Sequence, residues 1–511
     1  MATKIKILST SDIHGRIYPY SYAKGGKEKQ ETWNGLARLS TLIKQLRDKN
    51  TILIDNGDTI EGSPLTFFHY LKNRDKVCPV SMAMRAIGYD YVNVGNHDFN
   101  YGARALFLHV LETGATCITS NFYYRGDQVG KPYVIRKIAG KKIAIVGVVT
   151  QHIPFWESAD NIRDMYFADA FDTLRNTVNI LKEKEQPDYI IAVYHGGFEK
   201  DPVTGKTTEK LTDENEAYRM ARDIRGIDIL ISGHHHRKLS GKLFDTYYTQ
   251  PSDKGEYLSC ITIDTGTGEI TPELLPLTDV EPDEAILKLA KKEEDACQVW
   301  LDQTLGTTKV DLRITDENEA RLHKAQLVTF LNKVQMEVTG AEISAASVFL
   351  GASGFEKKIT MRNLVGTYVY PNTLVVKRMS GKALKAYLEK CAAFWTVKDG
   401  KIVIDPQFDF PTPQHYNYDM LDGIEYTLKI SNPVGKRVVS LTRNGEEITG
   451  KMRFSVCINN YRASGGGGFD VVLECATIKE VQTGMVDILA KYIMDHKTID
   501  FEPVHNVKLI I

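Results

Sequence analysis

The sequence is poor in the features that mark disulfide-rich, membrane-spanning and nucleic-acid-binding proteins. Its 511 residues include only seven cysteines, which are widely spaced and never form a C-x-x-C pair. This argues against a disulfide framework and against a thiolate zinc site. The sequence contains no span of about 20 apolar residues, so we expect no membrane-spanning helix and no membrane partner. The formal net charge is -1, so no overall field draws the chain to a nucleic acid polymer.

The start of the chain also lacks an apolar signal core, because residues 1–12 enter a strand pattern almost at once. A cytoplasmic protein is the simplest expectation, and a secreted or periplasmic protein whose leader was removed is the alternative. Internal repeats and low-complexity tracts are missing too. Nothing suggests an exposed coiled coil or a repeat surface, which argues against a structural or interaction protein, and we expect a monomer.

Length and composition indicate a globular protein with more than one domain. Hydrophobic residues make up 42% and charged residues 25%, which is ordinary, but 511 residues exceed what one hydrophobic core holds. Residues 281–304 form a charged amphipathic helix pattern, with Pro282 near its start and Gly306 just past its end. We place the linker there. We therefore expect a layered α/β domain at residues 1–280 and an α+β domain at residues 305–511.

Strands and helices alternate in the first half, which is typical of a layered α/β domain. The expected strands are 5–8, 51–55, 91–94, 115–120, 142–149, 189–194 and 227–232, followed by closing antiparallel strands at 243–250 and 256–264. The expected helices are 35–48, 64–71, 79–87, 101–113, 168–184 and 213–224. The second half has helix patterns at 316–338, 381–394 and 478–496, and strand patterns at 342–350, 424–430 and 452–458.

Polar side chains follow five of these strands at the point where each strand ends. The central example is Gly95-Asn96-His97-Asp98, which closes the apolar run that begins at Tyr91. Taken alone, such a stretch reads as an ordinary turn, an Asp as a helix N-cap, and His234 to His236 as a surface loop. Five such ends together favour a ligand site at one edge of the sheet. The residues are Asp12, His14, Asp58, Asn96, His195, His234 and His236.

Imidazole and oxygen ligands without thiols suit two divalent ions such as Mn2+, Zn2+, Fe2+ or Co2+. Asp58 lies between the two ligand groups in sequence and is the best candidate for a bridging carboxylate. Two such ions clamp a phosphoryl group and make hydroxide available near neutral pH. Asn96 supplies a neutral oxygen. His97 diverges from its neighbour Asn96, so we interpret it as a catalytic donor to the phosphoryl charge or the leaving oxygen.

The five strand ends resemble, in order, the five sequence blocks of calcineurin-like metallophosphoesterases. The longer block from Gly57 to Pro64, together with the second half, resembles the two-domain 5'-nucleotidase family. This resemblance implies a four-layer α/β sandwich followed by a nucleotide-binding domain. It also implies two ligand sets that share Asp58. One ion would be held by Asp12, His14, Asp58 and His236, and the other by Asp58, Asn96, His195 and His234.

One position departs from the family. Many 5'-nucleotidases have an Asp three residues after the catalytic His, and this chain has Asn100 there. An Asn can orient the His97 imidazole but stabilises its cation less than a carboxylate does. We therefore expect Asn100 to act with His97 in catalysis, with His97 as a donor rather than a strong base.

A glycine-rich segment in the second half predicts a slot for a planar ring. Four glycines, residues 465–468, follow Tyr461 and remove side-chain bulk beside it, although a flexible glycine loop is the alternative. The resemblance implies that two aromatic side chains sandwich the nucleoside base. We assign one wall to Tyr461 and the other to Tyr416 or Tyr418, of which Tyr418 could equally be core. The expected substrate-binding residues are Tyr461, Tyr416, Tyr418, Asn459, Gly466 and Asp470.

The segments 368–374, 416–419 and 460–467 resemble the 2',3'-cyclic-nucleotide 2'-phosphodiesterase/3'-nucleotidases most. The stretch 347–355 lacks the arginines that are usual in the 5'-nucleotidase and UDP-sugar hydrolase branch, which favours a substrate with one phosphate near the ribose. We therefore predict a dimetal enzyme that hydrolyses 2',3'-cyclic nucleotides and then 3'-nucleotides. The rivals are a 5'-nucleotidase of broad specificity and a catalytically idle nucleotide sensor.

Overall fold

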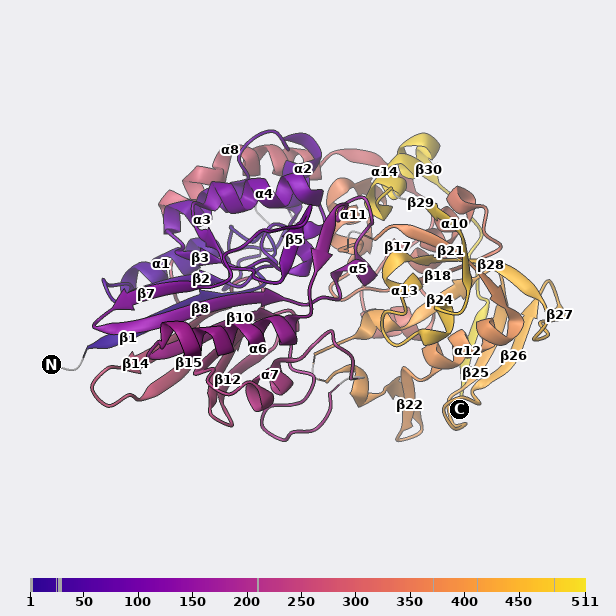
Figure 1. Cartoon of the computed structure of the whole chain (residues 1–511). Coiled ribbons are helices and arrows are strands. Elements are labelled where there is room, and N and C mark those ends of the chain that lie inside the picture. The colour runs from indigo at the N-terminus through magenta and orange to yellow at the C-terminus, as the bar shows by residue number, and fades with distance from the viewer. Residues whose placement is uncertain are drawn as a thin grey trace. The chain divides into compact units, whose positions relative to one another are not determined.

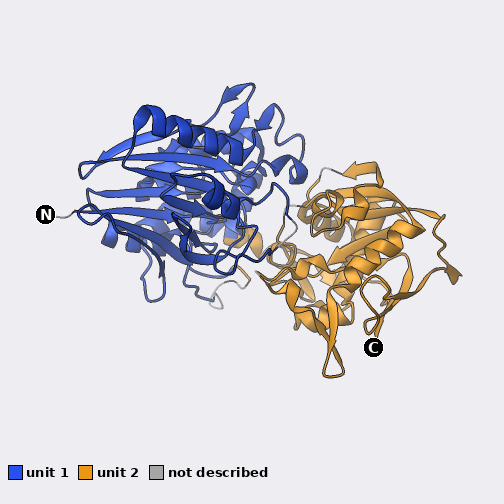
Figure 2. Ribbon diagram, turned by 60° about the horizontal axis from the view of Figure 1, so that its bottom comes forward, with its two compact units in different colours: residues 1–21, 28–297 blue, residues 22–27, 298–511 orange. Residues whose placement is uncertain are grey.

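The computed structural model describes residues 3–23, 25, 30–208, 211–370, 372–410, 412–481 and 483–511. The chain divides into two compact units, which Figure 2 shows in blue and orange. Unit 1 is Met1–Ser21 with Glu28–Cys297, and unit 2 is Tyr22–Lys27 with Gln298–Ile511. The division falls within helix α8 (Glu284–Leu301), and the linker role of 281–304 stays a prediction. Pro371, in the 368–374 segment, lies outside the described residues.

Unit 1 contains two six-stranded sheets. The first has the order β15-β14-β1-β2-β3-β4, in which β1 to β4 are parallel and β14 is antiparallel to both β1 and β15. Its strands are β1 (Lys4–Thr10), β2 (Thr51–Asp55), β3 (Tyr91–Val92), β4 (Thr116–Cys117), β14 (Tyr257–Asp264) and β15 (Ile270–Pro276).

The second sheet has the order β12-β13-β11-β10-β8-β7, in which β8, β10, β11 and β13 are parallel. Its strands are β7 (Val134–Ile138), β8 (Lys141–Val149), β10 (Tyr189–His195), β11 (Ile229–Ser232), β12 (Lys238–Leu243) and β13 (Thr246–Pro251). A small three-stranded sheet contains β5 (Phe122–Tyr124), β6 (Asp127–Gln128) and β9 (Met165–Phe167).

Helices cover the outer face of each sheet, so unit 1 has four layers. In Figure 1, α1 to α4 and α8 lie on one side of the sheets, and α6 and α7 lie on the other. These helices are α1 (Leu36–Leu46), α2 (Pro64–Lys72), α3 (Pro79–Ile87), α4 (Gly102–Thr113), α6 (Ala170–Ile180) and α7 (Ala217–Asp223), and a short helix α5 spans Ile153–Trp156.

The core explains the layering. Fully buried isoleucines such as Ile7, Ile54, Ile191 and Ile231 fill the space between the two sheets. β-branched side chains pack well on a pleated surface, so strands rich in isoleucine favour this sheet-on-sheet contact. A second cluster packs α6 and α7 against the outer face of the second sheet, with Phe171 among its members. The predicted four-layer α/β sandwich is confirmed.

Two predictions for unit 1 need correction. The strand predicted at 243–250 begins only at Thr246, because Phe244 adopts a left-handed φ of 53° in the turn between β12 and β13. β13 pairs antiparallel with β12, as predicted, but parallel with β11 on its other side. The helix predicted at 168–184 changes after Ile180 into a π-helical turn, η3 (Leu181–Glu185).

Unit 2 mixes sheets and helices, as the α+β prediction requires. Its largest sheet has the order β24-β18-β28-β21-β29, and a four-stranded sheet has the order β27-β26-β25-β31. Smaller sheets pair β20-β16-β30, β17-β19 and β22-β23. The helices are α9 (Glu317–Leu322), α10 (Gln326–Thr339), α11 (Met361–Thr367), α12 (Gly381–Ala392), α13 (Asn460–Ala463) and α14 (Met485–His496).

The strands of unit 2 are short and extend to the last residues of the chain. They are β16 (Thr304–Thr308), β17 (Leu312–Arg313), β18 (Ile343–Ser347), β19 (Gly354–Phe355), β20 (Lys358–Thr360), β21 (Leu374–Ser380), β22 (Trp395–Lys398), β23 (Lys401–Ile404), β24 (Asp419–Asp422), β25 (Glu425–Lys429), β26 (Val438–Arg443), β27 (Glu446–Glu447), β28 (Arg453–Asn459), β29 (Ala476–Val481), β30 (Thr498–Ile499) and β31 (Val507–Ile510). Within the described residues, no helix combines the length and the apolar character needed to cross a bilayer.

Two helix predictions for unit 2 are also wrong in part. The helix expected at 316–338 is two helices, because Lys324 turns at a left-handed φ of 50°. The buried ammonium of Lys324 donates to Asp422 at 2.8 Å and to Thr329 at 2.7 Å, which holds the break. The helix expected at 478–496 begins only at Met485, because residues up to Val481 form β29 and pair with β21.

Candidate metal centre

The seven predicted ligands lie at or just after the carboxyl ends of parallel strands. Asp12 and His14 follow β1, Asp58 follows β2, and Asn96 begins a 3₁₀ turn, η2 (Asn96–Phe99), after β3. His195 is the last residue of β10, and His234 and His236 follow β11. Close contacts join ligands of the first sheet to ligands of the second: His14 contacts His236, and Asp58 contacts His195. The strand ends of both sheets therefore meet at one site.

The backbone at this site is strained. Five of the seven residues adopt a left-handed φ, which costs a non-glycine residue about 1–3 kcal/mol and persists only where surrounding contacts impose it. The φ values are 56° for Asp12, 49° for His14, 54° for Asp58, 69° for His234 and 53° for His236. Such a concentration of strain at one place is typical of a functional site.

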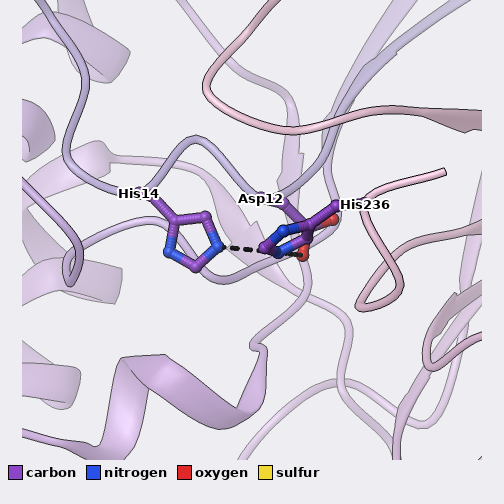
Figure 3. Close-up of side chains that lie close together, drawn as sticks. All are labelled: Asp12, His14 and His236. Carbon is purple, nitrogen blue, oxygen red and sulfur yellow. Dashed lines mark hydrogen bonds and ion pairs between the residues drawn. The ribbon is translucent and has the colours of Figure 1, made fainter. Parts of the chain in front are cut away.

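The first group of three contains Asp12, His14 and His236, whose candidate ligand atoms all lie within 4.8 Å of one another. Figure 3 shows the two imidazoles facing each other with the Asp12 carboxylate beside them. The Nε2 atoms of His14 and His236 are 3.0 Å apart, and Nε2 of His236 is 3.5 Å from Oδ1 of Asp12. Two imidazole nitrogens and one carboxylate oxygen that could bind a metal ion therefore lie close together.

The second group contains Asp58, His195 and His234, also within 4.8 Å. Oδ2 of Asp58 is 3.2 Å from Nε2 of His195, and Oδ1 of Asn96 is 2.8 Å from Nδ1 of His234. The same Asn96 oxygen lies 3.3 Å from Nε2 of His195. Asn96 therefore joins this group through its neutral oxygen, as the sequence predicts.

Each histidine of the two groups has a second partner on its other ring nitrogen. His14 faces the carbonyl oxygen of Glu61 at 3.1 Å, and His195 faces that of Asn56 at 2.6 Å. His234 contacts the carboxylate of Glu214 at 3.2 Å, and His236 lies 3.7 Å from that of Asp253. Metal-binding histidines usually donate their remaining N–H to such oxygens, which fixes the tautomer and leaves the other nitrogen bare.

These contacts fit a pair of divalent cations. With Nδ1–H of His14 donating to a carbonyl, its Nε2 lone pair faces Nε2 of His236 and has a use only if a proton or a cation lies between them. Oδ2 of Asp58 is buried, and its 3.2 Å contact with Nε2 of His195 lies outside hydrogen-bond geometry. An acceptor without a donor is costly in a buried site unless it binds a cation.

The pKa shifts of Asp58 and His195 also fit a bound cation. Burial raises the pKa of Asp58, but the charges of His195 and His97 outweigh it and hold that pKa well below its usual range. Burial lowers the pKa of His195, yet the Asp58 carboxylate overrides this and raises it to about 10. The site thus compensates the Asp58 carboxylate with positive charge, which either a proton on His195 or a bound cation supplies.

His97 lies beside the two groups rather than in either of them. Its backbone N–H donates to Oδ1 of Asp58 at 2.7 Å, and its ring centroid is 5.5 Å from that of His14. Nδ1 of His97 is 2.8 Å from Oδ1 of Asn100 and 3.6 Å from the Glu61 carboxylate. Burial lowers its pKa, but Asp58 and Glu61 produce a net rise. His235 points elsewhere, with its ring against Gly197.

One buried carboxylate holds two of the loops together. Asp98 accepts the backbone N–H groups of Asp58 at 2.9 Å, Thr59 at 2.8 Å and Ile60 at 3.1 Å. It also accepts that of Gly95 at 2.9 Å. Four donors on one carboxylate fix the Asp58 loop against the His97 loop, and hydrogen bonds to a charged acceptor are among the strong ones.

Gly95 shows how closely these loops approach. A Cβ atom at this position would lie 2.2 Å from Oδ1 of Asp58 and 2.6 Å from Cε1 of His195. No side chain therefore fits there, which explains why a glycine ends the central strand pattern.

The predicted base slot lies in unit 2. The rings of Tyr416 and Tyr461 are 6.1 Å apart between centroids at an interplanar angle of 74°. A Cβ on Gly466 would lie 2.6 Å from Cζ of Tyr461, so any residue larger than glycine would clash with that ring. Tyr370 is also 6.1 Å from Tyr416, so the slot has a third aromatic neighbour.

Arg462 ties the two sides of this slot together. Its buried guanidinium donates to Oδ2 of Asp419 at 2.8 Å, to the carbonyl oxygen of Tyr416 at 3.1 Å and to that of Gly466 at 2.5 Å. Asn459 accepts the backbone N–H of Arg462 at 2.7 Å and caps α13. Asp470 is exposed and begins a 3₁₀ turn, η6 (Asp470–Val472).

Tyr418 does not line the slot. It is 1% exposed and stacks on Phe394 at 5.1 Å, with Trp395 across its edge at 5.3 Å. The structure therefore leaves Tyr416 as the candidate opposite Tyr461, because a side chain packed in the core presents no free ring face to a ligand.

The sequence analysis missed three carboxylates beside the histidines, those of Glu61, Glu214 and Asp253. Glu61 lies within the block from Gly57 to Pro64 and could have been found there. Glu214 lies 20 residues before His234 and Asp253 comes after β13, and no local pattern marks either one. Asp98 was part of a quoted block, but its bonding role needs three-dimensional contacts.

Comparison with known proteins agrees with this geometry. Residues 5–238 match the calcineurin-like phosphoesterases, and residues 304–474 match the C-terminal domain of 5'-nucleotidases. A Staphylococcus aureus protein assigned to the 5'-nucleotidases, solved in complex with alpha-ketoglutarate, superposes with a TM-score of 0.91 at 30% identity over 100% of both chains. The chain belongs to the two-domain 5'-nucleotidase family of metallophosphoesterases. Members of the calcineurin-like group use divalent metals, which the residues of unit 1 suit.

Curated relatives in this family act on nucleotides. The 2',3'-cyclic-nucleotide 2'-phosphodiesterase/3'-nucleotidase of Haemophilus influenzae is 27% identical, over 90% of this chain and 80% of its own length. The trifunctional nucleotide phosphoesterase YfkN of Bacillus subtilis is 26% identical over 97% of this chain. The chain spans only 38% of the length of YfkN.

The Asp98 contacts predict a loss of stability in the variant Asp98→Asn. Its amide group would turn an N–H toward at least one backbone donor, so we expect a free energy of unfolding lower by about 2–4 kcal/mol. Urea unfolding measures the difference. The matched control is Asp75→Asn, because that carboxylate is exposed and pairs only weakly with Arg104. Equal unfolding curves for Asp98→Asn and the control would show that the four hydrogen bonds do not hold the loops.

Proposed function

We propose that the chain is a dimetal nucleotide phosphoesterase that opens 2',3'-cyclic nucleotides to 3'-nucleotides and hydrolyses these to nucleoside and phosphate. The observation that carries the proposal is the presence of two groups of possible ligands at the strand ends, Asp12 with His14 and His236, and Asp58 with His195 and His234. The names of the relatives support the substrate class.

Two divalent ions fit the donor set, which combines carboxylate, amide and imidazole ligands without thiols. Asp12, His14 and His236 would hold one ion, and Asn96, His195 and His234 the other, with Asp58 shared between them. When bound, such ions supply the Lewis acidity that ionises water near neutral pH and neutralises phosphoryl charge. Their identity is open among Mn2+, Zn2+, Fe2+ and Co2+.

The remaining steps fall to side chains beside these ligands. Each hydrolysis consumes one water: attack at phosphorus first breaks the P–O2' bond and then the P–O3' bond. His97, held through its N–H to Asp58, is placed to donate to the phosphoryl charge or to the leaving ribose oxygen. Asn100 orients its ring from the far side through the 2.8 Å contact.

Unit 2 would recognise the base. A planar base stacks on aromatic faces, and Tyr416 and Tyr461 offer two of them at the glycine segment. No arginine occurs in the sequence of 347–355, and Arg321, which donates to the carbonyl of Val348 at 2.9 Å, is fully buried. This supports a mononucleotide without a second phosphate.

The second candidate is a 5'-nucleotidase of broad specificity. It is favoured by the Staphylococcus aureus structure, whose identity to this chain, 30%, exceeds that of the cyclic phosphodiesterase of Haemophilus influenzae, 27%. A monomeric state and a cytoplasmic location stay predictions from the sequence.

Phosphate release with Mn2+ from 2',3'-cyclic AMP, 3'-AMP and 5'-AMP tests the proposal. We expect turnover of the first two to exceed that of 5'-AMP, and chelation with EDTA to abolish all three until Mn2+ is restored. For the cyclic substrate the assay follows both 3'-AMP and phosphate.

Preference for 5'-AMP would contradict the cyclic-nucleotide proposal and favour the 5'-nucleotidase alternative. Hydrolysis that survives complete metal removal would contradict the dimetal site.

The variant Tyr461→Ala separates base recognition from chemistry. Loss of one stacking face costs about 1–3 kcal/mol, so we expect the KM for 3'-AMP to rise about 5- to 150-fold. Hydrolysis of glycerol 2-phosphate, which has no base, should not change. Tyr166→Ala removes an exposed tyrosine of unit 1 and is the control. An equal loss on both substrates would contradict a base-stacking role.

A further inference from the structure

The loop after β8 carries a carboxylate that the mechanism has not used. Glu157 follows the short helix α5, and its Oε2 accepts the side-chain N–H of Asn100 at 2.5 Å. Asn100 in turn faces Nδ1 of His97 with its Oδ1 at 2.8 Å. The three side chains therefore form a chain from the loop to the ring of His97.

Further contacts fix the Glu157 carboxylate in its place. Its Oε1 accepts the backbone N–H of Ser158 at 2.6 Å and the side-chain N–H of Asn161 at 2.9 Å. The amide of Asn161 also donates to the backbone carbonyl oxygen of Asn100 at 2.9 Å. Both carboxylate oxygens thus have donors, and the loop is joined to Asn100 at its side chain and its backbone.

This arrangement determines which way the Asn100 amide points. An ionised carboxylate can only accept hydrogen bonds, so the NH2 group of Asn100 must face Glu157. Its carbonyl oxygen must then face His97, and the ring nitrogen that meets this oxygen must carry a proton. His97 is thereby held with a proton on Nδ1, and its Nε2 is the nitrogen left for the phosphoester, to which it donates when it carries the second proton of the ring.

An asparagine alone would not achieve this. Without a fixed acceptor beside it, the amide can turn over and present NH2 to Nδ1, which would move the ring proton to Nε2. A ring that faces NH2 at Nδ1 cannot carry protons on both nitrogens, so it loses its cationic form, which is the stronger donor at Nε2. The carboxylate that the family usually places directly next to the histidine is here one amide further away and comes from a different loop.

We propose that Glu157 is a positioning residue for His97, acting through Asn100. The proposal rests on the phosphoesterase function proposed above. Burial raises the pKa of Glu157 above its ordinary value, and the donors at Ser158, Asn161 and Asn100 oppose that rise by favouring the carboxylate. The Glu61 carboxylate, 3.6 Å from Nδ1 of His97, lies beyond hydrogen-bonding distance and does not replace the Asn100 contact.

The variant Glu157→Gln should reverse the chain of hydrogen bonds. Ser158 and Asn161 would keep the carbonyl oxygen of the new side chain, so its NH2 group would face Asn100 and force that amide to turn. We expect kcat for 3'-AMP to fall about 10- to 100-fold with KM little changed, because Glu157 orients His97 and does not touch the substrate.

The double variant Asn100→Asp with Glu157→Gln should recover most of that loss. The carboxylate would then lie next to His97 and accept both its Nδ1–H and the NH2 group of the glutamine. Asp160→Asn is the matched control, because it removes an exposed carboxylate from the same loop, where Asp160 pairs with Arg163. Thermal unfolding of all variants shows whether they fold.

Nitrogen NMR of 15N-histidine-labelled protein supplies a readout that does not depend on turnover. The signal of His97 is identified by its absence in His97→Gln, with diamagnetic Zn2+ in place of Mn2+ and at a pH where the ring is neutral. We expect the proton on Nδ1 in the wild type and on Nε2 in Glu157→Gln. The wild-type measurement alone decides the point if a variant fails to fold.

The outcomes separate the two proposals. A wild-type protein that hydrolyses none of the three nucleotides would contradict the proposed function, while the NMR still tests the tautomer. An active wild type whose His97 carries its proton on Nε2 would overturn the role of Glu157. So would a folded Glu157→Gln variant with wild-type kcat, or a folded double variant with no recovery over Glu157→Gln.

Discussion

The site depends on a single buried carboxylate that holds two loops of the first sheet together. Asp98 takes the backbone N–H groups of three consecutive residues from Asp58 onward, and also that of Gly95. Together with Asp55, which accepts the N–H of Gly57 and the hydroxyl of Thr59, these bonds hold Asp58 at a left-handed φ of 54° with Oδ2 buried. A side chain outside the proposed ligand set thus helps to determine where Asp58, the proposed shared ligand, lies.

The histidines of the proposed ligand set are likewise held in place by neighbouring groups. Carbonyl oxygens orient His14 and His195, and carboxylates orient His234 and His236. Each of these contacts joins residues that are far apart in the chain. Each proposed histidine ligand is therefore oriented by a neighbouring oxygen, and His97 with its contacts to Asn100 and on to Glu157 follows the same pattern beside them.

The layered fold was predictable from the sequence because it depends on local patterns, and the same patterns suggested the ligand set, which stays a prediction. Apolar runs of strand length end in polar residues, and β1, β2, β10 and β11 form close to where those runs lie. The breaks at Phe244 and Lys324 could not be predicted, since each follows from a turn that distant contacts impose. The Lys324 break needs Asp422, about a hundred residues later, and the role of Glu157 needs Asn100. Tyr418 looked like a possible base-binding side chain until its packing on Phe394 was known.

The central claim is that Asp58 is shared between two metal ions. Crystals grown with Mn2+ and measured at its absorption edge test this most directly, because anomalous difference density locates the ions independently of activity. We expect two peaks about 3.5–4 Å apart, one beside Asp12, His14 and His236 and one beside Asn96, His195 and His234, with Asp58 in contact with both. A single peak, or two peaks of which only one contacts Asp58, would contradict the account.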